Sequence, residues 1–539
     1  MTGTMGEALK RTVDCFPDRI FLRDGDRQLT FRETSARVDA IGRALLAMGL
    51  KRHDRLALWM PNSPEWALFA LACGSLGILL VPLNTRSKAE ETAYILRKSK
   101  VKALVMVDRF WTIDYCELLA EAIPGFSRSN SGVRNRDALP HLDSILLFDG
   151  GVDDFGVERW AAGSGVDGPS LEKAKAAVKA DDPFLTVFTS GTTGYPKGAV
   201  HTHVILRNVE NIARGMHIES GDVVMGHMPF FHVAGLCTAL LPAVINGCTL
   251  VTMAQWDPVE AARTIAGLRA NIFGGIPTHF IDLAEAVERE GLDTSCLKGA
   301  WIGGATVSPE IARHAKDVLR VQALQAAYGM TETSACTTLS RFEDPLEIAC
   351  EGKGVPIGDF EVRVADPETG AERQAGENGE IWVRGHIVMK EYLEDPAETA
   401  RAMTPDGWFR TGDLGHFDAD GYLKLTGRLK DMFIVGGSNV YPAEVERCLD
   451  AMPGVRQAVV VGVPDKRLGE VGFAFVELDG SAGLSDGDVL AFAKRSLADY
   501  KVPRHIRFVE DFPMTGARKI QRHVLVSKAI ALLGALQNG

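Results

Sequence analysis

Thr189-Ser190-Gly191-Thr192-Thr193-Gly194-Tyr195-Pro196-Lys197-Gly198 is the stretch that says most about the fold and chemistry of this chain. An apolar run precedes it and another β-rich run follows, so the pattern predicts a strand, a glycine-rich loop and a second strand. Glycines bring backbone N–H groups close to an anion, while the hydroxyls and Lys197 add donors and a positive charge. The loop therefore suits a polyphosphate, although it lacks the Gly-Lys-Ser/Thr order of an ordinary P-loop. A solvated surface loop would explain the composition but not the order.

The decapeptide resembles the phosphate-binding signature of the acyl-adenylate-forming superfamily, which includes acyl-CoA synthetases, peptide-synthetase adenylation domains and luciferases. Five further matches follow in the order expected for that superfamily. They are Trp301-Ile302-Gly303-Gly304-Ala305, Tyr328-Gly329-Met330-Thr331-Glu332-Thr333, Trp408 to Asp413, Gly427 to Glu446, and Pro513 to Lys519. The resemblance covers nearly the whole chain. It implies an enzyme that activates a carboxylic acid with ATP.

Bulk properties favour a globular enzyme that acts on small molecules. The chain has 539 residues, too many for one typical domain, with 46% hydrophobic and 24% charged residues. A net charge of −11 argues against non-specific binding to nucleic acid. The most apolar stretch, Trp66 to Val81, falls short of the roughly 20 residues that a membrane-spanning helix needs. We expect a buried helix there that runs into a strand at Leu79-Leu80-Val81.

The cysteines indicate the compartment. Nine cysteines are scattered without a Cys-x-x-Cys pair, which favours neither a disulfide framework nor a zinc site. The N-terminus lacks a basic region followed by an apolar core, so no secretory signal is predicted. We expect a cytoplasmic protein without a transmembrane segment, with an oligomeric state that the sequence leaves open.

Alternating helical and strand patterns in the first third predict an α/β fold with parallel strands. Thr30-Phe31-Arg32-Glu33 has capping-box spacing before a helical pattern, and Ala103 to Val107 reads as a buried strand. A new α+β pattern begins near Lys430. The resemblance places a hinge there, between a large N-terminal domain of layered α/β subdomains (1–429) and a small mobile C-terminal domain (430–539).

The resemblance also implies how the nucleotide is held. Glu332, beside Thr331, corresponds to the magnesium ligand, and carboxylate and phosphate oxygens are the ligands that Mg²⁺ prefers. Asp413 would accept hydrogen bonds from the ribose hydroxyls, with Arg428 on the ribose or phosphate. The other expected nucleotide-binding positions are Thr189, Ser190, Gly191, Thr192, Thr193, Gly194, Lys197, Gly303, Gly304, Ala305, Ala327, Tyr328, Gly329 and Thr331. Taken alone, Thr331 to Thr333 would read as a helix cap, and Asp413 as a turn residue.

The C-terminal domain would serve both half-reactions. Lys519 corresponds to the lysine that reaches the carboxylate and the α-phosphate during adenylation, although Arg518 replaces the usual preceding glycine. Gly436 and Gly437 correspond to the loop that lines the pantetheine tunnel for coenzyme A, where a side chain would obstruct the passage. Lys430 would be the hinge.

His232 is the remaining candidate. In the superfamily this position gates or lines the acyl pocket, although a histidine among apolar residues is more often a core residue. Relatives that activate amino acids place an aspartate nearby, and none occurs between Pro229 and Gly235. His201 and His203 would face one side of a strand, and two histidines without a third ligand read as structural.

Together these features predict an ATP-dependent acyl-CoA synthetase that uses Mg²⁺ and coenzyme A on a hydrophobic, fatty or alicyclic carboxylic acid. The acid reacts first to acyl-AMP with release of pyrophosphate, and then to acyl-CoA with release of AMP. Three alternatives stay open: an acyl-AMP ligase that loads a carrier protein, a luciferase-like enzyme, and a nucleotide sensor without catalysis.

Overall fold

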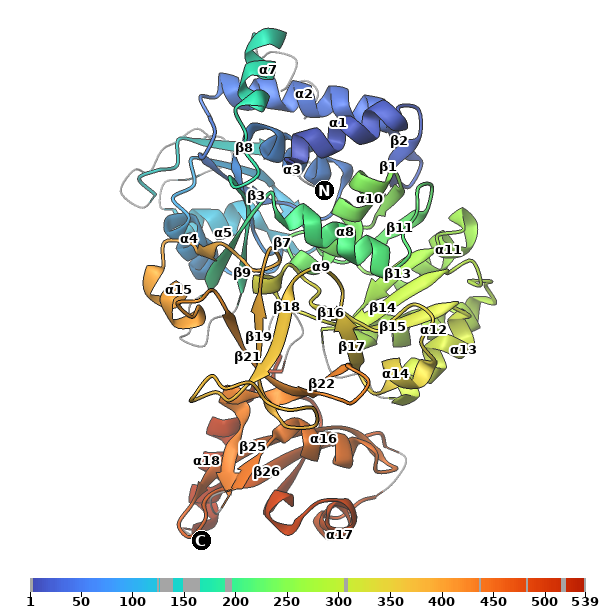
Figure 1. The fold of residues 1–539 in the computed structure, drawn as a ribbon, viewed down its shortest axis with the longest axis vertical. Coiled ribbons are helices and arrows are strands. Elements are labelled where there is room, and N and C mark those ends of the chain that lie inside the picture. The colour runs from blue at the N-terminus through green and yellow to red at the C-terminus, as the bar shows by residue number, and fades with distance from the viewer. Residues whose placement is uncertain are drawn as a thin grey trace. The chain divides into compact units, whose positions relative to one another are not determined.

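The computed structural model describes residues 3–123, 126, 139–148, 165–189, 196–304, 309–435, 438–480, 483–514 and 520–537 (Figure 1). These divide into two compact units, and each is described by itself. The first unit comprises Met1–Glu361 and Val383–Phe409, and the second comprises Val362–Trp382 and Arg410–Gly539. The second unit thus contains residues 430–539 together with earlier segments, and the predicted domain boundary near Lys430 stays a prediction. A hinge at Lys430 stays a prediction.

A seven-stranded sheet in the first unit carries the strands on either side of the phosphate loop. Its order is β20-β10-β9-β4-β3-β5-β8. The strands from β9 to β8 run parallel, whereas β10 is antiparallel to both β9 and β20. The bounds are β3 Arg55–Trp59, β4 Leu79–Pro82, β5 Ala103–Val107, β8 Ser144–Phe148, β9 Pro183–Thr189, β10 Lys197–Thr202 and β20 Glu391–Tyr392. The predicted strand–loop–strand pattern is therefore confirmed at both of its strands.

A second group of paired strands in the first unit has the order β17-β16-β15-β14-β13-β11-β12-β1-β2. The six strands from β15 to β1 run parallel, so their carboxyl ends lie along one edge. Ligands bind at such edges in open α/β sheets. The bounds are β1 Ile20–Asp24, β2 Arg27–Thr30, β11 Val223–Gly226, β12 Thr249–Thr252, β13 Ile272–Gly275, β14 Gly299–Gly303, β15 Ala323–Tyr328, β16 Thr338–Leu339 and β17 Lys353–Pro356.

Helices cover these strands, and Figure 1 shows α11, α12 and α13 packed along β13, β14 and β15. The helical bounds are α1 Met5–Cys15, α2 Phe31–Ala47, α3 Pro64–Leu76, α4 Ala89–Lys98, α5 Tyr115–Ala122, α7 Gly168–Ala176, α8 Ile205–Gly215, α9 Val233–Gly235, α10 Leu241–Asn246, α11 Pro258–Leu268, α12 Pro277–Glu290, α13 Pro309–Leu319, α14 Leu346–Cys350 and α15 Pro396–Ala402. A π-helical turn, Leu236–Leu240, joins α9 to α10, and a small hairpin is formed by β6 Arg109–Phe110 and β7 Ile113–Asp114. The predicted capping box begins α2, since Thr30 and Glu33 each bond the other's backbone N–H.

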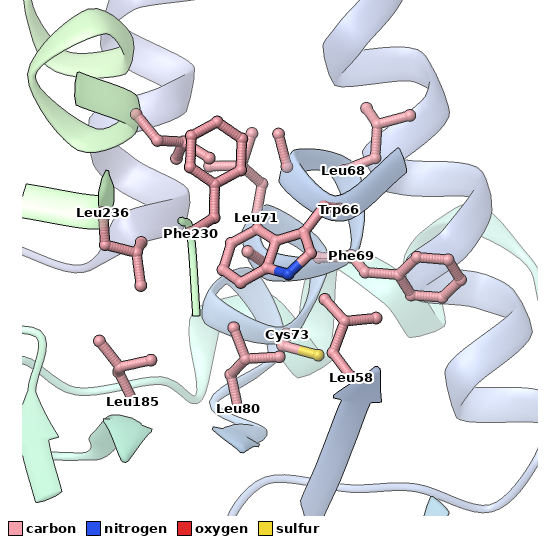
Figure 2. Packing of buried hydrophobic residues seen from close by; sticks show 14 of the residues in the cluster. Leu58, Trp66, Leu68, Phe69, Leu71, Cys73, Leu80, Leu185, Phe230 and Leu236 are labelled. Carbon is pink, nitrogen blue, oxygen red and sulfur yellow. The ribbon is translucent and has the colours of Figure 1, made fainter. Parts of the chain in front are cut away.

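One hydrophobic core of the first unit surrounds α3, every residue of which is buried. Figure 2 shows Trp66 of this helix among Leu80, Leu185, Phe230 and Leu236, which come from separate parts of the chain. The Trp66 and Phe230 rings are tilted, with their centroids 5.4 Å apart. The prediction of a buried helix leading into a strand is confirmed by α3 and β4. In the described part of the chain, no helix combines the length and apolar character needed to cross a bilayer.

The second unit has α+β character. One group of its strands has the order β18-β19-β21-β22, with bounds β18 Glu361–Ala365, β19 Gly379–Arg384, β21 Phe409–Phe417 and β22 Leu423–Arg428. A five-stranded sheet contains β23 Phe433–Val435, β24 Ser438–Val440, β25 Val455–Asp465, β26 Gly469–Leu478 and β27 His505–Val509. Its helices are α16 Pro442–Asp450, α17 Asp486–Ser496 and α18 Arg522–Gln537. Residues of α16 and α17 pack on one face of β25 and β26, and residues of α18 pack on the other. The predicted fold class, a large α/β region with a small α+β region, is confirmed.

Candidate functional site

The two strands beside the phosphate loop hold its ends together. Thr189 and Lys197 face each other in the β9–β10 ladder, and the Thr189 hydroxyl lies 3.5 Å from the Lys197 carbonyl oxygen. The intervening positions Ser190, Gly191, Thr192, Thr193 and Gly194 lie outside the described residues. Their predicted contacts with phosphate stay predictions.

Lys197, the cation of this loop, has an acidic partner. Its ammonium pairs with the carboxylate of Glu398 on α15, and Arg401 on the same helix also pairs with that carboxylate. The Lys197 ammonium lies 5.5 Å from the centroid of the Tyr392 ring, within the range of a cation–π contact. Lys197 is therefore held in place on one side of β10 by α15 and β20.

A short 3₁₀ turn, Thr331–Thr333, follows β15 and carries the predicted magnesium ligand. Glu332 is 5% exposed, and its Oε1 accepts a hydrogen bond from the Tyr392 hydroxyl at 2.8 Å. Burial, and then the negative charge of Glu332, raise the pKa of Tyr392 above its usual value, so the phenol keeps the proton that it donates. The Glu332 carboxylate is thus oriented by a neutral donor within the protein.

His201 joins this turn to the strand that leaves the phosphate loop. Its Nε2 lies 2.7 Å from the Thr331 carbonyl oxygen and donates to it. Burial lowers the pKa of His201 to about 4, so the ring is neutral at pH 7 and one nitrogen carries the hydrogen. The hydrogen bond is consistent with the structural role predicted for His201, because it holds the turn that carries Glu332 against β10.

The glycines and small residues after β14 and β15 let the two strand ends lie close together. Gly303 pairs with Ala327, and a Cβ atom on Gly303 would lie 2.4 Å from the Ala327 carbonyl oxygen. Gly304 has a φ of +76°, a conformation that favours glycine. Tyr328 ends β15, and a Cβ atom at Gly329 would lie 2.2 Å from the Ala335 carbonyl oxygen. Ala305 lies outside the described residues.

His232 follows β11 and occupies the N-cap position of α9. Its ring centroid lies 5.5 Å from that of Phe231, and its backbone N–H donates to the Pro229 carbonyl oxygen at 3.1 Å. Gly235 makes this turn possible, because a Cβ atom there would lie 2.3 Å from the Pro229 carbonyl oxygen. A role for His232 at an acyl pocket stays a prediction.

In the second unit, the structure brings Asp413 and Arg428 together as facing residues of β21 and β22. The Arg428 Nε lies 3.0 Å from Asp413 Oδ1, and Arg428 is exposed whereas Asp413 is buried. Lys430 lies in an exposed position on the 3₁₀ turn Leu429–Asp431. Gly436, Gly437 and Lys519 lie outside the described residues, so the roles expected of them stay predictions.

The backbone around Asp413 depends on Glu380, which sequence reasoning missed. Glu380 is 2% exposed and accepts hydrogen bonds from the Gly412 N–H at 3.1 Å and the Trp382 indole at 2.8 Å. The Arg410 guanidinium also donates to it, at 3.1 Å. Its only signal in the sequence is a carboxylate between the apolar neighbours of β19. Tyr392 and Glu398 were missed in the same way, because their partners are distant in sequence.

The AMP-binding enzyme family matches residues 9–393, and the AMP-binding enzyme C-terminal domain matches residues 444–519. A Mycobacterium tuberculosis CoA ligase is 37% identical over 522 residues, covering 96% of this chain and 97% of that protein. Its name specifies a propanoyl group attached to a methyl-dioxo-octahydroindenyl ring system. The mitochondrial medium-chain acyl-CoA ligase ACSF2 of Danio rerio is 33% identical, covering 99% of this chain and 89% of that protein.

Solved structures agree with this likeness. The crystal structure of ATP-bound MatB from Rhodopseudomonas palustris superposes with a TM-score of 0.85 at 28% identity, covering 98% of this chain and 99% of the other. The family match spans most of the first unit and continues into the second. From the motifs, the fold and these matches together, the chain belongs to the AMP-binding enzyme family.

Proposed function

We propose that this protein is an ATP-dependent carboxylate–CoA ligase. The observation that carries the proposal lies in the first unit, where β10 and the Thr331–Glu332 turn are joined by the hydrogen bond from His201. This bond places the strand that carries Lys197 beside the buried carboxylate of Glu332. The relatives named as CoA ligases, which match nearly the whole chain, support the same activity.

In the first half-reaction a carboxylate oxygen of the acid bonds to the α-phosphorus of ATP, and the bond from that phosphorus to pyrophosphate breaks. Both reactants are anions, so catalysis depends on positioning and on offsetting negative charge. Lys197 supplies a positive charge at the end of the phosphate loop. Lys519 is proposed to supply another at the reacting carboxylate and α-phosphate.

Glu332 fits a magnesium ion by the chemistry of its donor atoms. Mg²⁺ is usually bound by one or two carboxylates together with phosphates of the nucleotide, rather than by a cage of protein ligands. When bound, the ion would neutralise charge on the phosphates. Thr331 and the Tyr392 hydroxyl would keep Glu332 in position.

In the second half-reaction a thiol attacks the acyl carbonyl carbon, AMP leaves, and the thiol proton passes to solvent. We propose that Asp413 and Arg428 hold the ribose and phosphate of the nucleotide, since a buried carboxylate accepts hydroxyl donors and the exposed guanidinium donates to phosphate. Gly436 and Gly437 are proposed to leave room for the pantetheine arm of coenzyme A.

The acid is proposed to be hydrophobic and to lack an α-amino group. The segment Phe230 to Ala234 offers no carboxylate to an ammonium group. The relatives support this class, since their names specify medium-chain and bicyclic acyl groups. We also propose a cytoplasmic location, on the pattern of the cysteines.

The test is ATP–pyrophosphate exchange with a panel of short, long, aromatic and alicyclic acids, followed by AMP release with coenzyme A. We expect exchange that requires both an acid and Mg²⁺, and that falls about a hundredfold in Glu332→Gln. The control variant is Glu343→Gln, which alters an exposed carboxylate. Pyrophosphate exchange without AMP release would favour an acyl-AMP ligase. Nucleotide binding without exchange, whichever acid is added, would favour a nucleotide sensor.

A further inference from the structure

Tyr392 lies between the phosphate-loop strand and the predicted magnesium ligand. It belongs to β20, where it pairs with Ala199 of the neighbouring strand β10. Two further backbone bonds flank it, from Lys390 N–H to the Val200 carbonyl and from Leu393 N–H to the Gly198 carbonyl, each at 2.7 Å. The position of Tyr392 relative to β10 is therefore set by backbone pairing on both sides.

The same segment is fastened to α15. The Tyr392 backbone N–H donates to the Thr399 hydroxyl at 2.9 Å, and Thr399 donates to the Asp395 carbonyl oxygen at the start of the helix. Glu398, the neighbour of Thr399, pairs with Lys197. The ring of Tyr392 and the carboxylate of Glu398, which both contact Lys197, therefore belong to one continuous segment of the chain.

The segment also holds Glu332 at two points. The Met389 N–H donates to the Glu332 carbonyl oxygen at 2.7 Å, and the Tyr392 hydroxyl donates to Oε1 at 2.8 Å. A buried carboxylate is costly unless donors reach it, and a hydrogen bond to a charged group is stronger than one between neutral groups. The hydroxyl therefore restricts the rotation of the Glu332 carboxylate as well as stabilising its charge.

We propose that Tyr392 is a positioning residue that sets the Glu332 carboxylate for Mg²⁺ and fixes its separation from the Lys197 ammonium. This inference rests on the proposed function, because it concerns the same nucleotide site. Residues that hydrogen-bond a metal ligand commonly change metal affinity 10–100-fold when removed. Loss of the hydroxyl should therefore weaken the contribution of the metal to nucleotide binding, rather than nucleotide binding in general.

The test compares Tyr392→Phe with Tyr115→Phe. Tyr115 is fully buried, and its hydroxyl donates one hydrogen bond of the same length, 2.8 Å, to the Thr85 carbonyl oxygen. Both variants lose one buried hydroxyl, but only Tyr392 contacts Glu332. Calorimetry measures the affinity of the full chain for α,β-methylene-ATP in a magnesium titration and in EDTA. Circular dichroism and thermal melting check the fold of each variant.

We expect Tyr392→Phe to need about tenfold or more Mg²⁺ to reach half of the metal-dependent affinity, with the affinity in EDTA within about twofold of wild type. Tyr115→Phe should leave both affinities unchanged and lower only the melting temperature. In a Glu332→Gln background the effect of Tyr392→Phe on the magnesium titration should largely disappear, because the two residues act through one contact.

Wild-type magnesium dependence in Tyr392→Phe would overturn the inference. Equal losses with and without metal, or an undiminished effect in Glu332→Gln, would also overturn it, because they would show a general structural role. The proposed function fails on a different result, the absence of acid-dependent pyrophosphate exchange in the wild-type protein. The calorimetric comparison does not depend on that reaction, so the two failures are distinguishable.

Discussion

Asp450 ends α16 in an unfavourable place for a negative charge. Partial burial, and then the charge of Glu446 one turn earlier, raise the pKa of Asp450 to about 7, although the Ala458 N–H donates to its carboxylate at 2.6 Å. The carbonyl groups at the end of a helix add to this effect. Replacing Asp450 with asparagine keeps an oxygen that accepts from Ala458 but removes the ionisation.

The size and sign of the effect follow from proton linkage. In the unfolded chain Asp450 ionises near 3.8, whereas in the native protein it keeps its proton until about pH 7. Between these pH values the native state binds more protons than the unfolded chain does. The stability that protonated Asp450 contributes in full below pH 3.8 is therefore lost as the pH rises through 7. The full difference corresponds to about 4 kcal/mol, and we expect about half of it because the side chain retains some exposure to water. At pH 8 Asp450→Asn should therefore be more stable than wild type by about 2 kcal/mol, with little difference at pH 4.5.

Hydrogen exchange in the full chain, read by mass spectrometry on peptides from β25 and β26, measures the opening free energy of the second unit. Rates at the two pH values are corrected for intrinsic exchange. Asp465→Asn is a control of opposite sign, because the N–H groups of Leu468 and Arg467 donate to this half-buried carboxyl and hold its pKa below its usual range. Its stabilising effect is present above the usual pKa and is lost as the pH falls. Equal opening free energies for wild type and Asp450→Asn at pH 8 would refute the reasoning.

Three other predictions concern the same chain. Lys519→Ala should abolish adenylation yet still convert supplied acyl-AMP and coenzyme A to acyl-CoA. Gly437→Trp should form acyl-AMP but not transfer its acyl group to coenzyme A. Equal loss of both half-reactions in each variant would contradict two separate roles. Arg522→Met should destabilise the protein by about 3–5 kcal/mol in urea denaturation, because it leaves the mostly buried Glu446 carboxylate without its guanidinium partner at 2.7 Å. Adding Glu446→Gln should restore much of this loss, and a double variant no more stable than Arg522→Met would contradict the explanation. Dithiothreitol should leave the melting temperature unchanged, because no disulfide joins the described cysteines, and a fall would reveal one.

Features that depend on neighbouring residues could be predicted from the sequence. The capping box of Thr30 and Glu33 acts within one helical turn, and the uniformly apolar run at Trp66 indicates a helix without a solvent face. The strands on either side of the phosphate loop were likewise marked by β-branched and aromatic residues. In each case the physical cause lies within a few residues.

The support around the candidate site could not be predicted in this way. The hydrogen bond between Tyr392 and Glu332 joins residues 60 positions apart, and that between Gly412 and Glu380 joins residues 32 apart. Neither Tyr392 nor Glu380 has a distinctive local spacing, because its function depends on which strands pair. The association of Val362–Trp382 with Arg410–Gly539 in one compact unit has the same origin.

The fully buried helix α3 has a consequence for synthesis of the protein. Its Trp66 packs on Phe230, and its core neighbours include Leu185 and Leu236 (Figure 2). A ribosome adding roughly 5–20 residues per second needs about 8–30 seconds to go from the first of these aromatic residues to the second. During that interval the helix emerges with all of its faces apolar and without its later partners. The nascent chain therefore exposes an apolar segment early in translation. Chaperones should bind this segment when it emerges and dissociate once the Phe230 region has left the exit tunnel.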